Sequence, residues 1–245
     1  MKKNISKEAK ELFLQLKQKG FIALVHLTIR VIVNCILYPY YSIFKSSKTF
    51  IFQKQTHHYF YHWYNTSWAN ERAVEVPIIM EIINKNSNKK ILEVGNVLSH
   101  YFYFNHDILD KYEKSKDVIN QDIINFQPSE EYELIVSIST LEHVGFDEKP
   151  KDPEKIIYAV ENLKKILAPH GKIIITLPLG YNYEMDRLLR DGKIEFTNVV
   201  YLKKVSRNNT WKEVNSKDVQ DITYNSFLQS ANGLVIGIIE KNKFT

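Results

Sequence analysis

The stretch Lys90-Ile91-Leu92-Glu93-Val94-Gly95-Asn96 decides how the rest of this chain is interpreted. It is a short apolar run that ends in an acid, a valine and a glycine. Such a run is typical of a strand buried on both faces of a parallel sheet. A glycine at the strand end lets the backbone turn sharply, and a helix expected from about Val97 would point its amide groups at a ligand. The stretch therefore predicts a central strand that leads into a ligand-facing turn.

Strands and helices alternate after this stretch, which predicts a parallel sheet. A helix is expected over about 70–85, where Pro77 predicts a late start or a kink, and a second helix follows Asp152-Pro153. Alternating aromatic residues over 48–61 predict a β-hairpin around Gln53-Lys54-Gln55. The other expected strands lie at 106–110, 118–120, 133–137, 172–177, 199–205 and 234–240. The long polar excursion between the last two favours an antiparallel C-terminal hairpin.

Length and composition fit one α/β domain with an appendage. The chain has 245 residues, of which 44% are apolar and 25% are charged, as is ordinary for a folded protein. The single cysteine, Cys35, cannot form an internal disulfide and belongs to no zinc pattern. A reducing compartment, the cytoplasm, is therefore the expected location.

Positive charge is concentrated at the N-terminus. Residues 1–54 carry a net charge of +8 and the remainder carries −3, within a total of +5. We interpret residues 1–47 as a basic helical arm and residues 48–245 as the main domain. A basic arm on a slightly acidic body favours an anionic surface, such as a membrane met by residues 1–45, and makes a nucleic-acid groove in the body unlikely.

The segment Phe21–Phe44 is the most apolar part of the chain, yet it contains His26, Arg30 and Asn34. An arginine at mid-membrane costs about 2.5–3.5 kcal/mol, so a membrane-spanning helix is disfavoured. On a helix, these residues form one polar stripe with Lys19 and leave a broad apolar face. That pattern predicts a helix lying peripherally at the inner face of the membrane, or else one packed on the body or on a second subunit.

Several motifs occur in a recognisable order, and together they resemble the class I S-adenosylmethionine-dependent methyltransferase family from about Arg72 to Glu240. The motifs are Ile91-Leu92-Glu93-Val94-Gly95, Val118-Ile119-Asn120-Gln121-Asp122 with 132–137, Thr140-Leu141-Glu142-His143-Val144, and 167–178. The segment Asn70-Glu71-Arg72-Ala73-Val74-Glu75 is similar to one found in bacterial members associated with surface glycans. The resemblance implies a Rossmann-like three-layer sandwich and S-adenosylmethionine as the cofactor.

The resemblance also implies a role for each matching residue. Gly95 would let the backbone approach the methionine part of the cofactor, and Glu93 would anchor its amino group directly or through water. Asp110 would accept the ribose hydroxyls, Asp122 would receive the adenine amino group, and Ile123 would stack on the base. The full set of expected cofactor contacts is Glu93, Gly95, Asn96, Asp110, Asp122, Ile123 and Ser137.

The sequence departs from the family pattern in two places. Asn96, Val97 and Ser99 stand where further glycines are common, so the glycine-rich loop is reduced to Gly95. The interval from Gly95 to Asp122 is also short, which predicts an abbreviated second strand or neighbouring helix.

For the reaction, His143 is the candidate general base and Glu142 is its neighbour, although both could instead cap a helix. The candidate acceptor-binding residues are Arg72, Glu75, Tyr181 and Asn182. The histidines His57, His58 and His62 lack an acid at metal spacing, and we expect no metal site.

The resulting hypothesis is O-methylation of a sugar or glycan intermediate. Two alternatives stay open: a non-catalytic S-adenosylmethionine-binding or scaffold protein, and a lipid or quinone methyltransferase at the membrane.

Overall fold

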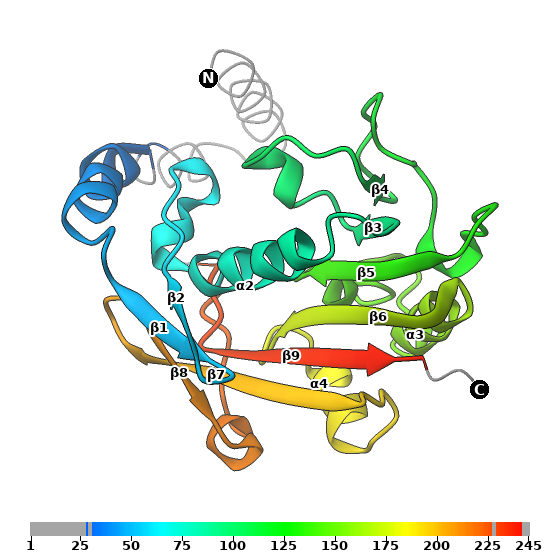
Figure 1. The fold of residues 1–245 in the computed structure, drawn as a ribbon. Coiled ribbons are helices and arrows are strands. Elements are labelled where there is room, and N and C mark those ends of the chain that lie inside the picture. The colour runs from blue at the N-terminus through cyan, green and yellow to red at the C-terminus, as the bar shows by residue number, and fades with distance from the viewer. Residues whose placement is uncertain (1–27, 29–30, 227–228, 242–245) are drawn as a thin grey trace.

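The computed structural model describes residue 28 and residues 31–226 and 229–241, so Lys19, His26 and Arg30 of the expected polar stripe lie outside the described residues. Its centre is a seven-stranded sheet in the order β4-β3-β5-β6-β9-β7-β8 (Figure 1). The strands are β3 (Ile91–Val94), β4 (Asp107–Leu109), β5 (Tyr132–Ile138), β6 (Leu167–Pro178), β7 (Asn198–Ser206), β8 (Thr210–Val214) and β9 (Gly233–Glu240). β3 is buried along its whole length, as its apolar sequence predicts.

The first four strands of the sheet are parallel, and the last three are added by antiparallel pairing. β4, β3, β5 and β6 run in one direction. β9 lies between β6 and β7 and is antiparallel to both. The expected antiparallel C-terminal hairpin is thus confirmed as the β7–β9 pair. The polar excursion between them contains β8, an edge strand paired with β7 that the sequence did not predict.

The side of the sheet next to β4 is short, as the small interval between Gly95 and Asp122 predicted. β4 has three residues. The strand expected at 118–120 is reduced to a single bridge between Leu109 and Ile119. This edge therefore consists mostly of loop, and that loop supplies part of the site described below.

Helices cover both faces of the sheet, which gives the three-layer sandwich (Figure 1). α2 (Arg72–Lys85) packs with β1 (Thr49–Phe52) on one face. α3 (Lys155–Lys165) and α4 (Tyr183–Arg190) pack on the other. β5 serves both cores, because Leu134 and Val136 belong to one and Ile135 to the other.

Pro77 lies inside α2 without ending it. In a regular helix the amide of residue 77 would donate to Ala73 O, and proline has no such group. The carbonyl of Ala73 instead accepts a hydrogen bond from Phe60 N at 2.9 Å. Pro77 therefore leaves one acceptor available, and the segment after β2 (Gln55–His58) uses it to attach to the helix.

A helix over residues 31–44 attaches to the body through its polar side. Asn34 Oδ1 accepts from Trp68 Nε1 at 2.7 Å, and the Tyr41 ring stacks on Trp68 with centroids 5.2 Å apart. The rest of the helix surface carries the exposed residues Val31, Ile32, Val33, Ile36, Tyr40, Ile43 and Phe44. Among the described residues, no helix has the length and apolar character needed to cross a membrane.

A buried residue of β5, the strand that contacts both cores, tests this architecture. Ile135 in β5 is 0% exposed, and Ile135→Ala should lower the free energy of unfolding by about 3 kcal/mol because the cavity left behind cannot collapse fully. Ile51→Ala is the matched control, since Ile51 is 61% exposed and its loss should change stability by less than about 0.5 kcal/mol. Urea denaturation measures both. Equal losses would contradict the assignment of β5 to the core.

Candidate active site

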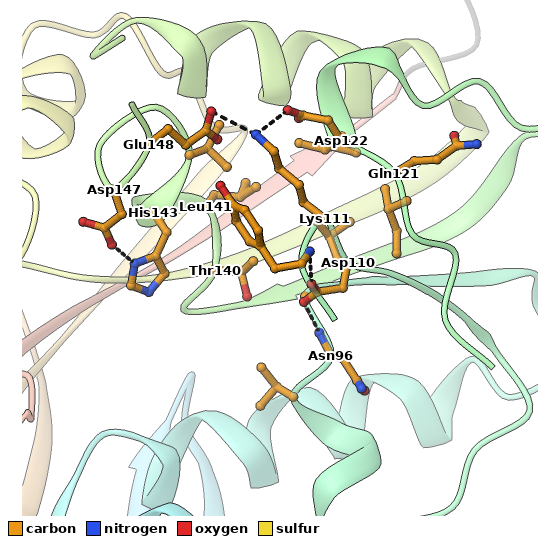
Figure 2. Close-up of a pocket in the computed structure, with 17 residues that line it drawn as sticks. Asn96, Asp110, Lys111, Gln121, Asp122, Thr140, Leu141, His143, Asp147 and Glu148 are labelled. Carbon is orange, nitrogen blue, oxygen red and sulfur yellow. Dashed lines mark hydrogen bonds and ion pairs between the residues drawn. The ribbon is translucent and has the colours of Figure 1, made fainter. Parts of the chain in front are cut away.

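A cavity of about 380 Å³ lies at the carboxyl ends of β3, β4 and β5 (Figure 2). This is the position at which parallel α/β sheets bind ligands. The polar residues that line it are Asn96, Asp110, Lys111, Gln121, Asp122, Thr140, His143, Asp147 and Glu148. Gly95, Ile123 and Leu141 contribute backbone and apolar surface.

Gly95 is required by geometry at the end of β3. Its φ of +87° is in the left-handed region, and a Cβ atom there would lie 2.1 Å from Thr140 Oγ1. Gly95 N also donates to Leu109 O at 2.8 Å. The glycine thus lets the loops after β3, β4 and β5 meet, and this meeting forms one wall of the cavity.

The Glu93 carboxylate forms hydrogen bonds within the protein. Its Oε1 accepts from the amides of Val97 and Leu98 at 2.9 and 2.7 Å, and its Oε2 lies 3.0 Å from His106 Nε2. The prediction of a helix from about Val97 is wrong, because only the three-residue 3-10 helix η2 (Leu98–His100) forms there. Glu93 is buried and does not line the cavity, so any effect on a ligand passes through the loop that it holds.

Asp110 lies in the cavity wall and organises the loop after β4. Its Oδ1 accepts from Tyr112 N at 2.8 Å and Glu113 N at 2.7 Å, while its Oδ2 accepts from Asn96 N at 3.2 Å. A carboxylate oxygen has two acceptor positions, so Oδ2 keeps one for a ligand hydroxyl. Ligand contact at Asp110 would therefore be to one oxygen.

Asp122 belongs to a ring of four charges at one end of the cavity, and Figure 2 shows three of them, Asp122, Glu148 and Lys111. Lys111 Nζ lies 2.9 Å from both Asp122 Oδ2 and Glu148 Oε2. Lys155 Nζ lies 2.8 and 2.6 Å from the same two oxygens. Burial acts to raise the pKa of both carboxyl groups, but hydrogen bonds from the two ammonium groups outweigh it and lower both pKa values.

Asp122 was predicted from the sequence, but its three partners, Lys111, Glu148 and Lys155, were not. Asp122 also caps η3 (Ile123–Asn125), because its Oδ1 accepts from Ile124 N at 3.3 Å. Lys111 directly follows Asp110 and Lys155 begins α3, and neither position carries a signal that it would turn toward Asp122. Asp122 and Ile123 both line the cavity, and their contact with an adenine ring stays a prediction.

His143 lies in the cavity wall and is half exposed, and its orientation is set by Asp147. Its Nδ1 is 2.5 Å from Asp147 Oδ2, and the Tyr181 hydroxyl donates to the same oxygen at 2.6 Å. Burial acts to raise the pKa of Asp147, but the hydrogen bonds from Tyr181 and His143 outweigh it and lower that pKa. An anionic Asp147 holds the proton on Nδ1 and leaves Nε2 as the basic nitrogen. His143 and Asp147 are four residues apart, and this spacing in the sequence could have predicted the pair.

None of the four expected acceptor residues, Arg72, Glu75, Tyr181 and Asn182, lines this cavity. Arg72 and Glu75 form a buried ion pair, and Glu75 Oε1 also accepts from Ser139 Oγ and Thr176 Oγ1, each at 2.6 Å. Asn182 is buried and caps α4, where its Oδ1 accepts from two amides. We therefore leave Glu75 and Asn182 out of the site.

Ser137 and Glu142 also point elsewhere. The buried Ser137 Oγ donates to Val94 O at 3.2 Å, which ties β5 to β3. Glu142 is buried beside His143 and does not line the cavity. Of the predicted site residues, Gly95, Asn96, Asp110, Asp122, Ile123 and His143 meet in one cavity.

The histidines near the N-terminus pack among aromatic rings. His57 stacks on Phe50, and His62 stacks on Phe60. Within the described part of the chain, no three His, Cys, Asp or Glu residues are placed to hold a metal ion.

No protein-family model matches the sequence, and no curated protein matches it. Partial similarity to solved structures exists. The N-methyltransferase NodS from Bradyrhizobium japonicum WM9, in complex with S-adenosyl-L-homocysteine, is 12% identical over 71% of this chain and 94% of its own, with a TM-score of 0.38. A possible histamine N-methyltransferase from Thermotoga maritima is 14% identical over 63% and 83%, with a TM-score of 0.40.

The plantazolicin methyltransferase BpumL, in complex with a triazolic desmethylPZN analogue and S-adenosylhomocysteine, is 16% identical over 73% of this chain and 90% of its own, with a TM-score of 0.39. Similarity of this size assigns no activity to the chain. The activity is therefore argued from the residues of the cavity.

The two lysines of the charge ring should differ in their effect on stability. Lys155 is 12% exposed, so Lys155→Met should cost about 2–3 kcal/mol at pH 7 by leaving two carboxylates underpaired. Lys111 is 34% exposed, so Lys111→Met should cost less than about 1 kcal/mol.

Urea denaturation at pH 7 and pH 3 measures this difference. The lowered pKa values of Asp122 and Glu148 stabilise the fold above their unfolded-state pKa values, and this stability is lost as the pH falls through the folded-state values. The cost of Lys155→Met should accordingly shrink at pH 3. Equal costs for both variants at pH 7 would argue against the ring as described.

Proposed function

We propose that this chain is an S-adenosylmethionine-dependent methyltransferase that acts on a hydroxyl oxygen. The observation that carries the proposal is a cavity at the carboxyl ends of β3, β4 and β5 with a paired His143 and Asp147 in its wall. A cavity of about 380 Å³ falls within the range of small-molecule and cofactor sites. One ligand could therefore contact the glycine turn, the acidic loops and the histidine together.

The residues present fit the cofactor. Gly95 lines the cavity, where its backbone would face the methionine part, and Thr140 beside it closes the turn. Asp110 Oδ2 retains acceptor capacity for a ribose hydroxyl, and Asp122 with Ile123 would meet the adenine at the other end. The bound cofactor supplies a methyl group on a sulfonium, which is already activated for transfer.

The chain's own contribution is to orient the acceptor and to move one proton. His143 Nε2 would take the proton from the acceptor hydroxyl, because Nδ1 is engaged by Asp147. Asp147 would stabilise the resulting imidazolium, and Tyr181 would hold the carboxylate in place. These roles for His143, Asp147 and Tyr181 follow the general logic of a base oriented by an acid.

We further propose a sugar or glycan intermediate as the acceptor. Two features support this choice: the resemblance of residues 70–75 to glycan-associated bacterial sequences, and a basic apolar arm suited to a lipid-linked substrate. The proposed location is the cytoplasm, with peripheral attachment to the inner face of the membrane through residues 1–45. A lipid or quinone acceptor would use the same arm.

Calorimetry and radiolabelled methyl transfer test the enzyme proposal together. Wild type should bind S-adenosylhomocysteine, and Asp122→Ala should weaken binding about tenfold by removing an acceptor of the adenine amino group. His143→Ala and Asp147→Asn should retain binding but lower kcat about a hundredfold. His58→Ala, an exposed histidine distant in sequence, is the control and should change neither quantity.

The outcomes separate the candidate functions. Failure of wild type to bind S-adenosylhomocysteine would remove the enzyme proposal. Binding without transfer to any glycolipid or nucleotide-sugar fraction would favour a scaffold protein. Methylation of RNA in place of these fractions would exclude the glycan acceptor.

The exposed side of the helix over 31–44 supports membrane attachment. Ile36 and Phe44 are 65% and 70% exposed, and the basic residues Lys45 and Lys48 follow directly. In a flotation assay with anionic liposomes, Ile36→Glu and Phe44→Glu should each reduce the floating fraction severalfold. Tyr158→Glu, at an exposed aromatic residue on α3, is the control. Equal flotation of all variants would contradict attachment through this face.

A further inference from the structure

Lys111 lies at the end of the cavity where the adenine is proposed to bind. Its Nζ is 2.9 Å from Asp122 Oδ2 and 2.9 Å from Glu148 Oε2, and all three residues line the cavity. Figure 2 shows the Lys111 side chain reaching these two carboxylates. The ammonium group therefore stands at the place that the proposed function gives to the adenine amino group.

The two carboxylate oxygens beside Lys111 already face two ammonium groups each. Lys155 Nζ lies 2.8 Å from Asp122 Oδ2 and 2.6 Å from Glu148 Oε2. A carboxylate oxygen has two acceptor positions. The other Asp122 oxygen, Oδ1, accepts from Ile124 N at 3.3 Å. An amino group that binds Oδ2 or Oε2 must therefore take the place of one ammonium group.

The two lysines differ in how easily a ligand can displace them. Lys155 is 12% exposed, begins α3 and does not line the cavity. Lys111 is 34% exposed and lines it. An ion pair of such exposure contributes little net stability, because water screens the charges and can solvate the released ammonium group. Lys111 is thus the lysine that a ligand displaces at the lower cost.

The backbone around Lys111 is held in place, so displacement requires movement of the side chain alone. Asp110 Oδ1 accepts from Tyr112 N and Glu113 N, and Lys111 O accepts from Asn120 Nδ2 at 2.8 Å. The Tyr112 ring is 69% exposed, and its centre lies 5.3 Å from Lys111 Nζ. An ammonium group that turns toward solvent can keep this cation–π contact.

We propose that Lys111 sets the affinity and base selectivity of the cofactor site, because the adenine amino group must replace its ammonium group at Asp122 and Glu148. The inference rests on the proposed function and adds a competing residue within the same site. A purine with a carbonyl in place of the amino group has an acceptor there, and this oxygen can accept from Lys111. Lys111 therefore weakens the binding of an adenine ligand without weakening that of the carbonyl analogue.

Calorimetry with two ligands tests the proposal. The probes are S-adenosylhomocysteine and S-inosylhomocysteine, in which a carbonyl replaces the adenine amino group. Lys111→Met should bind S-adenosylhomocysteine at least about threefold more tightly than wild type does, because no ammonium group is displaced. Its affinity for S-inosylhomocysteine should stay equal or fall. Lys114→Met, at an exposed lysine of the same loop, is the control and should keep both wild-type affinities.

NMR of the lysine ammonium groups follows the displacement in wild type. The Lys111 signal is assigned through its side-chain carbons. Hydrogen bonds to two carboxylates slow the exchange of the ammonium hydrogens with water, so saturation with S-adenosylhomocysteine should make this exchange severalfold faster. An exchange rate that does not rise in the saturated protein would contradict displacement.

The outcomes distinguish this proposal from the proposed function. If wild type does not bind S-adenosylhomocysteine, the proposed function fails. If wild type binds it and a folded Lys111→Met protein binds it equally or more weakly, only the Lys111 proposal is overturned. Tighter binding of both ligands by this variant overturns it as well, because the gain would not depend on the amino group. The ammonium exchange in wild type decides the matter even if the variant does not fold.

Discussion

The close approach of Gly95 to Thr140 is the constraint on which the site depends. A Cβ atom at position 95 would lie 2.1 Å from Thr140 Oγ1, so the loops after β3 and β5 can meet only if the first of them turns at a glycine. The amide of Gly95 also binds Leu109 O, which adds the loop after β4. One small residue thus brings three strand ends together around a cavity.

Three acids near this cavity stabilise the protein structure itself. Glu93 holds the turn after β3, Asp110 holds the loop after β4, and Asp122 caps η3 and joins two lysines. Each satisfies backbone amides or ammonium groups that would otherwise be unpaired near the protein interior. Glu142 differs, because one of its buried oxygens has no partner among the described residues.

The helix over 31–44 packs on the body through a side that the amphipathic pattern does not predict. A helix with a broad apolar face usually buries that face. Here Asn34 and Tyr41 attach to Trp68, and Ile36 and Phe44 on the other side stay exposed. Hydrogen bonds and aromatic stacking supply the attachment, so the apolar side remains available for another surface.

The sequence by itself determined most strands of the sheet, the helices α2 and α3 and the turn at Gly95, because hydrophobic periodicity and glycine geometry are local properties. Asp122 and His143 were also predicted from the sequence as site residues, and both line the cavity. Only the tertiary structure decided the partners of Asp122 and Asn34, because Lys155 lies 33 residues from Asp122 and Trp68 lies 34 residues from Asn34. The edge strand β8 was missed for the same reason, since its pairing with β7 depends on the assembled sheet. Contacts between side chains far apart in the chain depend on how the elements pack, and the local sequence pattern does not predict them.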